Sequence, residues 1–299
     1  MAVISWIQLG LLSSALAFAH YPPTGSVLAP RLGPKMPLSI ETLEGTDVSS
    51  CERRNTNVPP GSLVDQLWQA NCDLVEKFLG NKFVLAQARQ EPGRLQETFQ
   101  SFQYYSVQDY YYLLETVPHE AFVMKTKPPV PMPALRSDIN EIIKSMNDSL
   151  DYVDSLRTNL TNPEKFNISE NTIDTGSLRT VGLGYVHWLK GNTELGWFGH
   201  GVSQIPCYYG WGEIATFLNG TSLIASLFFE QWIEPNLDFA SGTKISEDLE
   251  PWKDLYVNNE TFAHYNQLFR EAIQFEIAFF ESAMNRTLAD VCDGICVNV

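Results

Sequence analysis

The amino-acid sequence predicts an all-α fold, a bundle of about seven long helices, on three observations. Apolar residues recur at the three- and four-residue spacing of amphipathic helices over most of the chain between residues 62 and 284. No segment alternates apolar and polar residues as a half-buried strand does, and no repeat of fixed period is present. Since 44% of the 299 residues are hydrophobic, we expect one domain with a substantial core.

The first core helix is expected over residues 62–80. Ser62 and Asp65 form a capping pair at its start, and an apolar stripe continues to Gly80. A second helix is expected over residues 99–123 and carries Asp109 among aromatic side chains. An ionised carboxylate there is costly unless it is paired or hydrogen-bonded. The alternative is that Asp109 lies on the solvated side of an amphipathic helix.

Further helices follow in the second half of the chain. A proline-rich link at 127–133 precedes a helix that begins near Ser137, whose stripe is Ile139, Ile142, Ile143, Met146, Leu150 and Val153. Residues 158–178 are polar and are expected to form a surface loop. Other helices are expected at 178–189, 194–217, 223–239 with an interruption at Pro235, and 261–284, where Glu276 has apolar neighbours.

Residues 1–19 have the pattern of a secretory signal peptide. The apolar run at 3–16 is too short to span a bilayer, and Ala17 and Ala19 form a small-x-small cleavage site. Residues 20–60 are rich in proline and are predicted to form an extended or disordered lead-in, which leaves 61–299 as the helical domain. No later stretch has about eighteen uninterrupted apolar residues, so we expect no membrane anchor in the mature protein.

Charge and sequons narrow the class of protein further. A net charge of −15 repels phosphate and anionic lipid, which excludes nucleic-acid binding as the function. Asn-x-Ser/Thr sequons occur at Asn147, Asn159, Asn167, Asn219, Asn259 and Asn285. Together with the leader they predict a eukaryotic glycoprotein that is extracellular or vacuolar.

The five cysteines leave one unpaired if the other four form bridges. Cys51 and Cys72 lie near the N-terminal side and Cys292 and Cys296 near the C-terminus. A bridge from the C-terminal tail to the N-terminal segment and two local bridges are both open, and in either case Cys207 is the free thiol.

Cys207 is the candidate reactive centre. Pro206 directly before it suits the first turn of a helix, so Cys207 is expected at a helix N-terminus, where the dipole lowers the pKa of a thiol. Trp211 then lies one turn further on the same face. The alternative is an inert buried cysteine.

Other site types have little support. Glu115 and His119 are spaced as half of a di-iron site, but no second half is visible, and His187, His200 and His264 fit packing or surface positions. No Gly-x-Ser-x-Gly motif indicates a serine hydrolase. We therefore expect neither a metal nor a cofactor.

Several separated motifs, in this order along the chain, resemble those of the TenA/thiaminase II family. They are Gln108-Asp109 with Tyr112, Pro206-Cys207-Tyr208 with Trp211, Trp232-Ile233, and Phe275-Glu276 with Phe279-Phe280, and the similarity covers roughly residues 63–286. The resemblance implies a heme-oxygenase-like helical bundle with a central pocket, commonly a homo-oligomer. It indicates a divergent secreted eukaryotic member of fungal type.

The family's chemistry is the hydrolysis of a C–N bond in an aminopyrimidine, with no cofactor. By resemblance Cys207 is the nucleophile, Glu276 the general acid and base, Asp109 the anchor for the ring's amidine edge, and Tyr112 a pocket tyrosine. The partner is then a small nitrogen heterocycle related to thiamin.

Three positions depart from the family's pattern. Trp211 and Asn236 stand where pocket tyrosines are usual, and Tyr185 is the nearest match to a third. Preserved chemistry with an altered pocket implies a different or enlarged substrate. The alternatives are a secreted binding protein without catalysis and, third, a metal-dependent oxygenase of the same fold.

Overall fold

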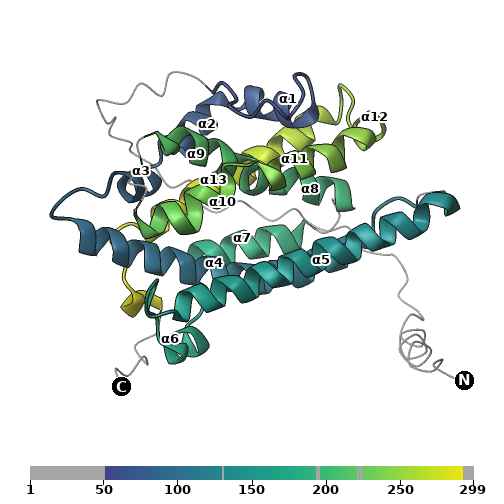
Figure 1. The fold of residues 1–299 in the computed structure, drawn as a ribbon. Coiled ribbons are helices and arrows are strands. Elements are labelled where there is room, and N and C mark those ends of the chain that lie inside the picture. The colour runs from purple at the N-terminus through teal and green to yellow at the C-terminus, as the bar shows by residue number, and fades with distance from the viewer. Residues whose placement is uncertain (1–50, 130, 193–195, 221, 223–224, 292–299) are drawn as a thin grey trace, which may run out of the picture. The chain divides into compact units, whose positions relative to one another are not determined.

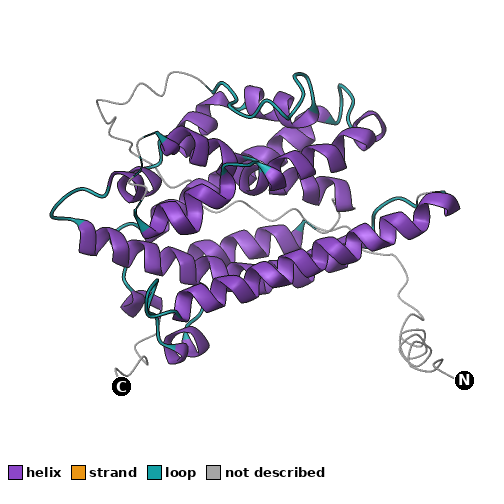
Figure 2. Ribbon diagram, viewed as in Figure 1, coloured by secondary structure: helices purple, strands orange, loops and turns teal. Residues whose placement is uncertain are grey.

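The computed structural model describes residues 51–129, 131–192, 196–220, 222 and 225–291. Every regular element within these ranges is a helix (Figure 2), which confirms the predicted all-α class. The α-helices are α1 (Leu63–Ala70), α2 (Cys72–Leu79), α3 (Lys82–Arg89), α4 (Leu95–Met124), α5 (Met132–Thr161), α6 (Glu170–Thr175), α7 (Thr180–Gly191), α8 (Gly196–Tyr208), α9 (Gly210–Asn219), α10 (Glu234–Asn236), α11 (Ala240–Leu249), α12 (Lys253–Tyr256) and α13 (Phe262–Ala283). A π-helix, η2 (Phe229–Ile233), and two 3₁₀ turns, η3 (Glu250–Trp252) and η4 (Leu288–Val291), complete the set.

Helix α13 lies at the centre of the bundle and packs against α8, α2, α7, α4 and α3 (Figure 1). Its buried apolar face repeats at helical spacing and includes Leu268, Phe269, Ile273 and Phe280. Because this stripe is visible in the sequence, the helix predicted at 261–284 is confirmed to within a residue at each end.

Helix α4 runs beside α5 (Figure 1) and is buried on nearly all sides from Phe102 to Tyr112. Asp109 is only 6% exposed, so the alternative of a solvated Asp109 is wrong. Pro118 lies inside α4 with its side chain exposed, and the helix continues beyond it to Met124.

Several predicted boundaries are wrong. The helix expected at 62–80 is two helices that meet at Asn71, whose buried amide donates to the Leu67 carbonyl at 2.6 Å. The supposed surface loop at 158–178 contains the end of α5 and all of α6, and it buries Phe166, Ile168 and Ile173. These apolar residues are too few and too irregularly spaced to show a helical period.

Helix α5 begins at Met132, earlier than the expected start near Ser137, because proline is tolerated in the first helical turn. Its predicted core stripe is only partly buried. Val153 is 7% exposed, but Ile139, Ile143 and Leu150 are about half exposed. Helices α3 and α11 have no counterpart among the predicted elements.

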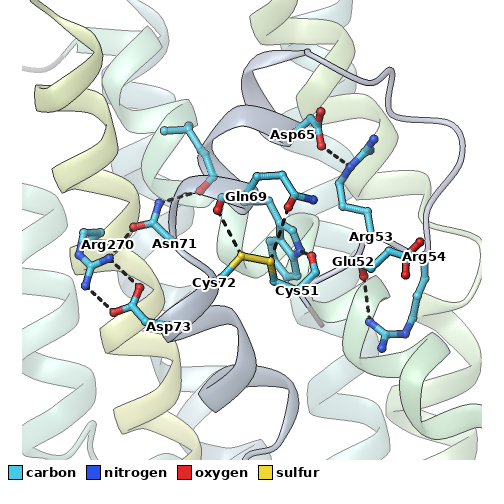
Figure 3. The surroundings of a disulfide bond; sticks show 12 residues. Cys51, Glu52, Arg53, Arg54, Asp65, Gln69, Asn71, Cys72, Asp73 and Arg270 are labelled. Carbon is cyan, nitrogen blue, oxygen red and sulfur yellow. Dashed lines mark hydrogen bonds and ion pairs between the residues drawn. A yellow bond between two sulfur atoms is a disulfide. The ribbon is translucent and has the colours of Figure 1, made fainter. Parts of the chain in front are cut away.

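The stretch 51–62 contains no helix but packs closely on the bundle. Figure 3 shows the Cys51–Cys72 disulfide, which is a local pairing, beside the ion pair of Arg53 with Asp65. The Trp68 indole donates to the Cys51 carbonyl at 3.0 Å, and Val58 is fully buried. The predicted signal peptide at 1–19, most of the predicted lead-in at 20–60, Cys292 and Cys296 lie outside the described residues.

The six sequon asparagines all lie in described helices or loops. Asn159 is half-buried on α5 and accepts a hydrogen bond from Lys165 at 3.1 Å. The other five asparagines are exposed. None of the helices in the described part of the chain is long and apolar enough to cross a membrane.

Candidate active site

Cys207 lies in the last turn of α8 and is partly exposed. Its thiol forms no disulfide with any other described cysteine. The prediction that it begins a helix is wrong, and so is the predicted depression of its pKa. Burial raises the pKa of the thiol well above its usual value, and the negative charges of Glu276, Asp109 and Glu120 raise it further. Cys207 is therefore a neutral thiol at pH 7 and needs a proton acceptor before it can attack.

Glu276 extends from the middle of α13 and is 3% exposed. The Tyr185 hydroxyl donates to its Oε1 at 3.0 Å, and the Trp211 indole donates to its Oε2 at 3.1 Å. Burial raises the pKa of Glu276 to about 7, although both hydrogen bonds lower it. A carboxyl that is half ionised near neutral pH can both accept and return a proton.

Asp109 lies on α4 beside a cleft between α4, α5 and η2. Burial, with a contribution from the charge of Glu276, raises the pKa of Asp109 to about 8. The cleft has about 390 Å³ of empty space, open solvent at its mouth included, and its lining comprises Phe102, Tyr105, Ser106, Asp109, Tyr152, Ser155, Leu156, Asn159, Phe166, Gln231 and Trp232. A protonated Asp109 can donate one hydrogen bond and accept another from the same ligand edge.

The buried hydroxyl of Tyr105 and the buried indole N–H of Trp232 lie together in the lining of this cleft, where the indole acts as a donor to the hydroxyl oxygen. Trp232 belongs to the π-helix η2, a distortion that is frequent at functional sites. The proton of the Tyr105 hydroxyl has no acceptor among the described residues, so a ligand that accepts a hydrogen bond gains affinity here.

Tyr112 and Tyr185 form an aromatic wall next to Glu276. Their ring centroids lie 5.0 Å apart, and Tyr185 also stacks on Phe275 at 4.9 Å. Burial raises the pKa of the Tyr112 hydroxyl well above its usual value, the charges of Cys207 and Glu276 raise it further, and a hydrogen bond with Tyr185 lowers it.

The structure brings together five of the six residues predicted for the site. Asp109, Tyr112, Cys207 and Glu276 interact electrostatically, and Trp211 bonds Glu276 directly. Asn236 donates instead to the backbone carbonyl of Trp232 at 2.6 Å. None of the described contacts joins Asn236 to the four titratable residues.

Sequence reasoning missed two residues of the site, Glu120 and Tyr152. Glu120 lies on α4 near its C-terminal end and accepts a hydrogen bond from the Tyr208 hydroxyl at 2.9 Å. The Tyr152 side chain lines the cleft from α5 and is affected by the charges of Asp109 and Cys207. A helical wheel could have found Glu120, because positions 109, 112, 116 and 120 lie on one face of a helix.

The histidines considered for a metal site lie apart from this cluster. His119 and His200 meet edge to face at 5.4 Å, and the Nε2 atom of each is buried without a partner. Glu115 is exposed and pairs with Lys190. Within the described ranges no three His, Cys, Asp or Glu side chains gather as metal ligands would.

The fold of the described helices is the heme-oxygenase-like helical bundle that TenA structures share. A TenA homologue from P. horikoshii OT3 superposes with a TM-score of 0.60 at 16% identity, over 75% of this chain and 98% of its own. A TenA family transcription regulator from Silicibacter sp. TM1040 gives 0.56 at 16% identity, over 76% and 98%. A candidate TenA-like thiaminase from Sulfolobus solfataricus P2 gives 0.53 at 19% identity, over 75% and 96%.

Sequence comparisons add nothing to this likeness, since no protein-family model and no curated protein sequence matches the chain. The named activities of the similar structures differ, and their identities are low. The likeness therefore shows the fold alone, and function has to be argued from the site.

Proposed function

We propose that the protein is a thiaminase II-like hydrolase that cleaves a C–N bond of an aminopyrimidine or a related heterocycle. The observation that supports it is the convergence of one free cysteine with two buried carboxyls, Asp109 and Glu276, whose pKa values lie near neutral pH. Each of these groups has one part in the reaction.

Asp109 binds the ring. Its protonated carboxyl donates to a ring nitrogen while its carbonyl oxygen accepts from the exocyclic amino group. Tyr112 and Tyr185 cover the ring face. Transfer of the Asp109 proton to the ring nitrogen withdraws electrons from the ring and makes its carbon atoms more electrophilic.

Cys207 then adds to an electron-poor ring carbon. The thiol proton passes to ionised Glu276, the S–C bond forms, and the electron pair of the C=N bond moves to the ring nitrogen protonated by Asp109. Protonated Glu276 next gives its proton to the leaving amine as the exocyclic C–N bond breaks. Departure of the amine draws the electron pair of the ring nitrogen through the ring and leaves an exocyclic C=C bond. Water adds to the methylene carbon of this bond and gives a proton to Glu276. The S–C bond then breaks, Glu276 returns its proton to the Cys207 sulfur, and the ring proton returns to Asp109, which restores the enzyme.

Two substitutions test this mechanism. Cys207→Ser and Glu276→Gln should each reduce turnover of an aminomethylpyrimidine or of thiamin by a factor of a thousand or more. Glu271→Gln is the matched control, since Glu271 lies on the same helix and bonds Trp188 instead of the site. Wild-type rates in both site variants would exclude the mechanism.

A secreted binding protein is the second candidate. Both carboxylate oxygens of Glu276 already accept a hydrogen bond, one from Tyr185 and one from Trp211. A carboxylate held in this way is less free to exchange a proton with a ligand, which favours a binding role. A thermal-shift screen with pyrimidines and other heterocycles, run beside a product assay, separates the two candidates. Stabilisation by a ligand that yields no product would support binding alone.

We also propose that the chain enters the secretory pathway and carries glycans. The leader-like residues 1–19 and the exposure of five sequon asparagines support this. Expression in a eukaryotic host, with peptide mass mapping before and after deglycosylation, tests it. An intracellular product with unmodified asparagines would contradict it.

A further inference from the structure

Asn159, one of the six sequon asparagines, lies in the lining of the cleft that contains Asp109. Tyr105 and Asp109 line this cleft from α4 and are buried, whereas Tyr152 and Ser155 line it from α5 and are exposed. The α4 residues therefore form the floor of the cleft and the α5 residues its rim. Residues 152, 155 and 159 share one face of α5, because they are spaced by three and four positions.

The side-chain amide of Asn159 belongs to a chain of polar contacts that links the α5 side of the cleft to the η2 side. Lys165 Nζ donates to Asn159 Oδ1 at 3.1 Å and lies 3.1 Å from Glu230 Oε1. Gln231, which lines the cleft from η2, donates to the same oxygen of Glu230 at 2.6 Å. The side chains of Lys165 and Glu230 are 27% and 55% exposed, so these contacts lie where solvent reaches the cleft.

This arrangement leaves the glycan-bearing atom of Asn159 without a structural role. N-glycosylation attaches the sugar to the side-chain nitrogen of the sequon asparagine. The contact with Lys165 uses Oδ1, and none of the described hydrogen bonds uses Nδ2. Leu160 is fully buried and fixes the turn of α5 on which Asn159 lies. A glycan on Nδ2 therefore starts at the rim, on the face that carries Ser155 and Tyr152.

We propose that Asn159 carries an N-glycan that narrows the mouth of the cleft and makes the cleft selective for small ligands. The cleft has about 390 Å³ of empty space with open solvent included, so only a small ring lies wholly within it. Such a ring still reaches Asp109 on the floor. A longer ligand has to extend through the mouth, where it meets the glycan. This inference rests on the proposed function, both for the glycosylation and for the kind of ring.

The first measurement is the occupancy of Asn159 in the full chain expressed in a eukaryotic host. Peptide mass mapping before and after deglycosylation should show a glycan at this position. An unmodified Asn159 in a chain that is glycosylated at its exposed sequons would overturn this inference and leave the proposed secretion standing. A chain without any glycan would overturn both.

Two variants on α5 isolate the effect of this glycan. Thr161→Ala destroys the sequon but keeps the Asn159 side chain. Ser149→Ala is the matched control, because it destroys the sequon of Asn147, which is exposed and does not line the cleft. At both substituted positions the hydroxyl donates to the backbone carbonyl four residues earlier, so the two changes remove the same kind of bond from the same helix.

Hydroxyl-radical footprinting measures the cover over the rim without any ligand. Tyr152 is 47% exposed, and Phe122, which is 49% exposed and lies outside the cleft lining, is the internal reference. Oxidation of Tyr152 relative to Phe122 should rise about twofold or more in Thr161→Ala and stay unchanged in Ser149→Ala, because a glycan is bulky. Equal oxidation of Tyr152 in the wild type and Thr161→Ala would overturn the inference.

Two ligands of different length test the selectivity. Hydroxymethylpyrimidine is a single ring, and thiamin carries a second ring on the same methylene. Calorimetry in the Cys207→Ser background measures both without turnover. Thr161→Ala should strengthen the binding of thiamin about tenfold or more and change that of hydroxymethylpyrimidine by less than about threefold. Ser149→Ala should change neither.

The outcomes separate this inference from the proposed function. An equal change for both ligands in Thr161→Ala, or no change, would overturn the selectivity and leave the proposed reaction standing. Failure of every variant to bind either ligand would overturn the proposed function, whereas the footprint of Tyr152 alone decides whether the glycan narrows the mouth.

Discussion

Two neighbouring side chains, Tyr185 and Trp211, adjust the pKa of Glu276. Burial disfavours its ionised form, whereas the hydrogen bonds from Tyr185 and Trp211 favour it, and the pKa of about 7 is the balance of these effects. Trp211 occupies a position where the resembling family usually has tyrosine. The indole N–H can donate to Glu276, but unlike a tyrosine hydroxyl it cannot accept a proton.

Trp211→Phe should shift the pH dependence of activity. Loss of its hydrogen bond raises the pKa of Glu276, and the proposed first step needs the ionised carboxylate. The acidic limb of kcat/KM, expected near pH 7, should therefore move to higher pH. Trp188→Phe removes an indole bond to Glu271 on the same helix and should leave the limb in place. An unmoved limb in Trp211→Phe would mean that another group is the base.

Asp109 should make the folded protein less stable as the pH rises. Its folded pKa of about 8 lies above the ordinary value of 3.8 for an aspartate, so between these values the folded state retains a proton that the unfolded chain has lost. The stability that Asp109 contributes is present below about pH 4 and declines by about 1.4 kcal/mol per pH unit up to its folded pKa.

Asp109→Asn removes this dependence. We expect the variant to gain stability over the wild type at pH 8 and to match it closely at pH 4. Urea unfolding at the two pH values measures the difference. Equal changes at both values would show that Asp109 is already ionised in the folded protein at pH 4.

The break between α8 and α9 is the element on which the site depends. It turns the chain at Tyr209, so that Cys207 ends one helix while Trp211 and Glu213 lie on the next. Glycines permit the close packing around this break. A Cβ on Gly212 would lie 2.4 Å from the Phe239 ring, and one on Gly210 would lie 2.7 Å from Phe78.

Gly212→Ala should lower the free energy of unfolding by about 1–3 kcal/mol, because the added methyl overpacks the contact with Phe239. The intrinsic preference of helices for alanine, up to about 1 kcal/mol, opposes this loss only in part. Gly220→Ala is the control, since Gly220 ends the same helix and faces open space. Chemical denaturation of both variants gives the comparison, and a stabilised Gly212→Ala would refute the packing argument.

The same elements show what the sequence could and could not predict. The helices α4 and α13 were predictable because long apolar stripes define them, and they carry Asp109 and Glu276. The helix predicted at 194–217 contains α8, but the end of α8 at Tyr208 was missed, since Pro206 has the pattern of a helix start. The glycines of α8 allow close packing against another helix. Leu249 of α11 approaches Gly201 so closely that a Cβ on Gly201 would lie 2.8 Å from the Leu249 side chain.

The partners of a carboxylate are harder to predict than its position. Tyr185 and Trp211 reach Glu276 from separate helices, and Tyr208 reaches Glu120 from α8. No local spacing encodes such contacts, because they depend on how the helices cross. Motif resemblance pointed to Glu276 as a candidate acid and base. The packing of α7, α9 and α13 determines the pKa of its carboxyl.

At the scale of the whole helical unit, the stretch 51–62 ties distant parts of the bundle together. One anchor is the Cys51–Cys72 disulfide at the junction of α1 and α2 (Figure 3). The other is Glu213 of α9, which is fully buried and accepts hydrogen bonds from the backbone N–H groups of Arg54 and Asn55 and from the Tyr209 hydroxyl. Glu213 follows Cys207 closely in the chain, so this stretch also supports the site.

We expect the two anchors to act cooperatively, since they hold one short segment. Replacing both Cys51 and Cys72 by serine should cost about 3 kcal/mol for a sequence separation of 21 residues. Glu213→Gln turns an acceptor into a partial donor that faces N–H groups and should cost about 1–3 kcal/mol for each group left unpaired. Once either anchor is lost the segment detaches more easily, so removing the second should cost less than it does alone. A double-mutant cycle by urea denaturation measures this coupling at about 0.5–3 kcal/mol, and additive losses would show that the anchors are independent.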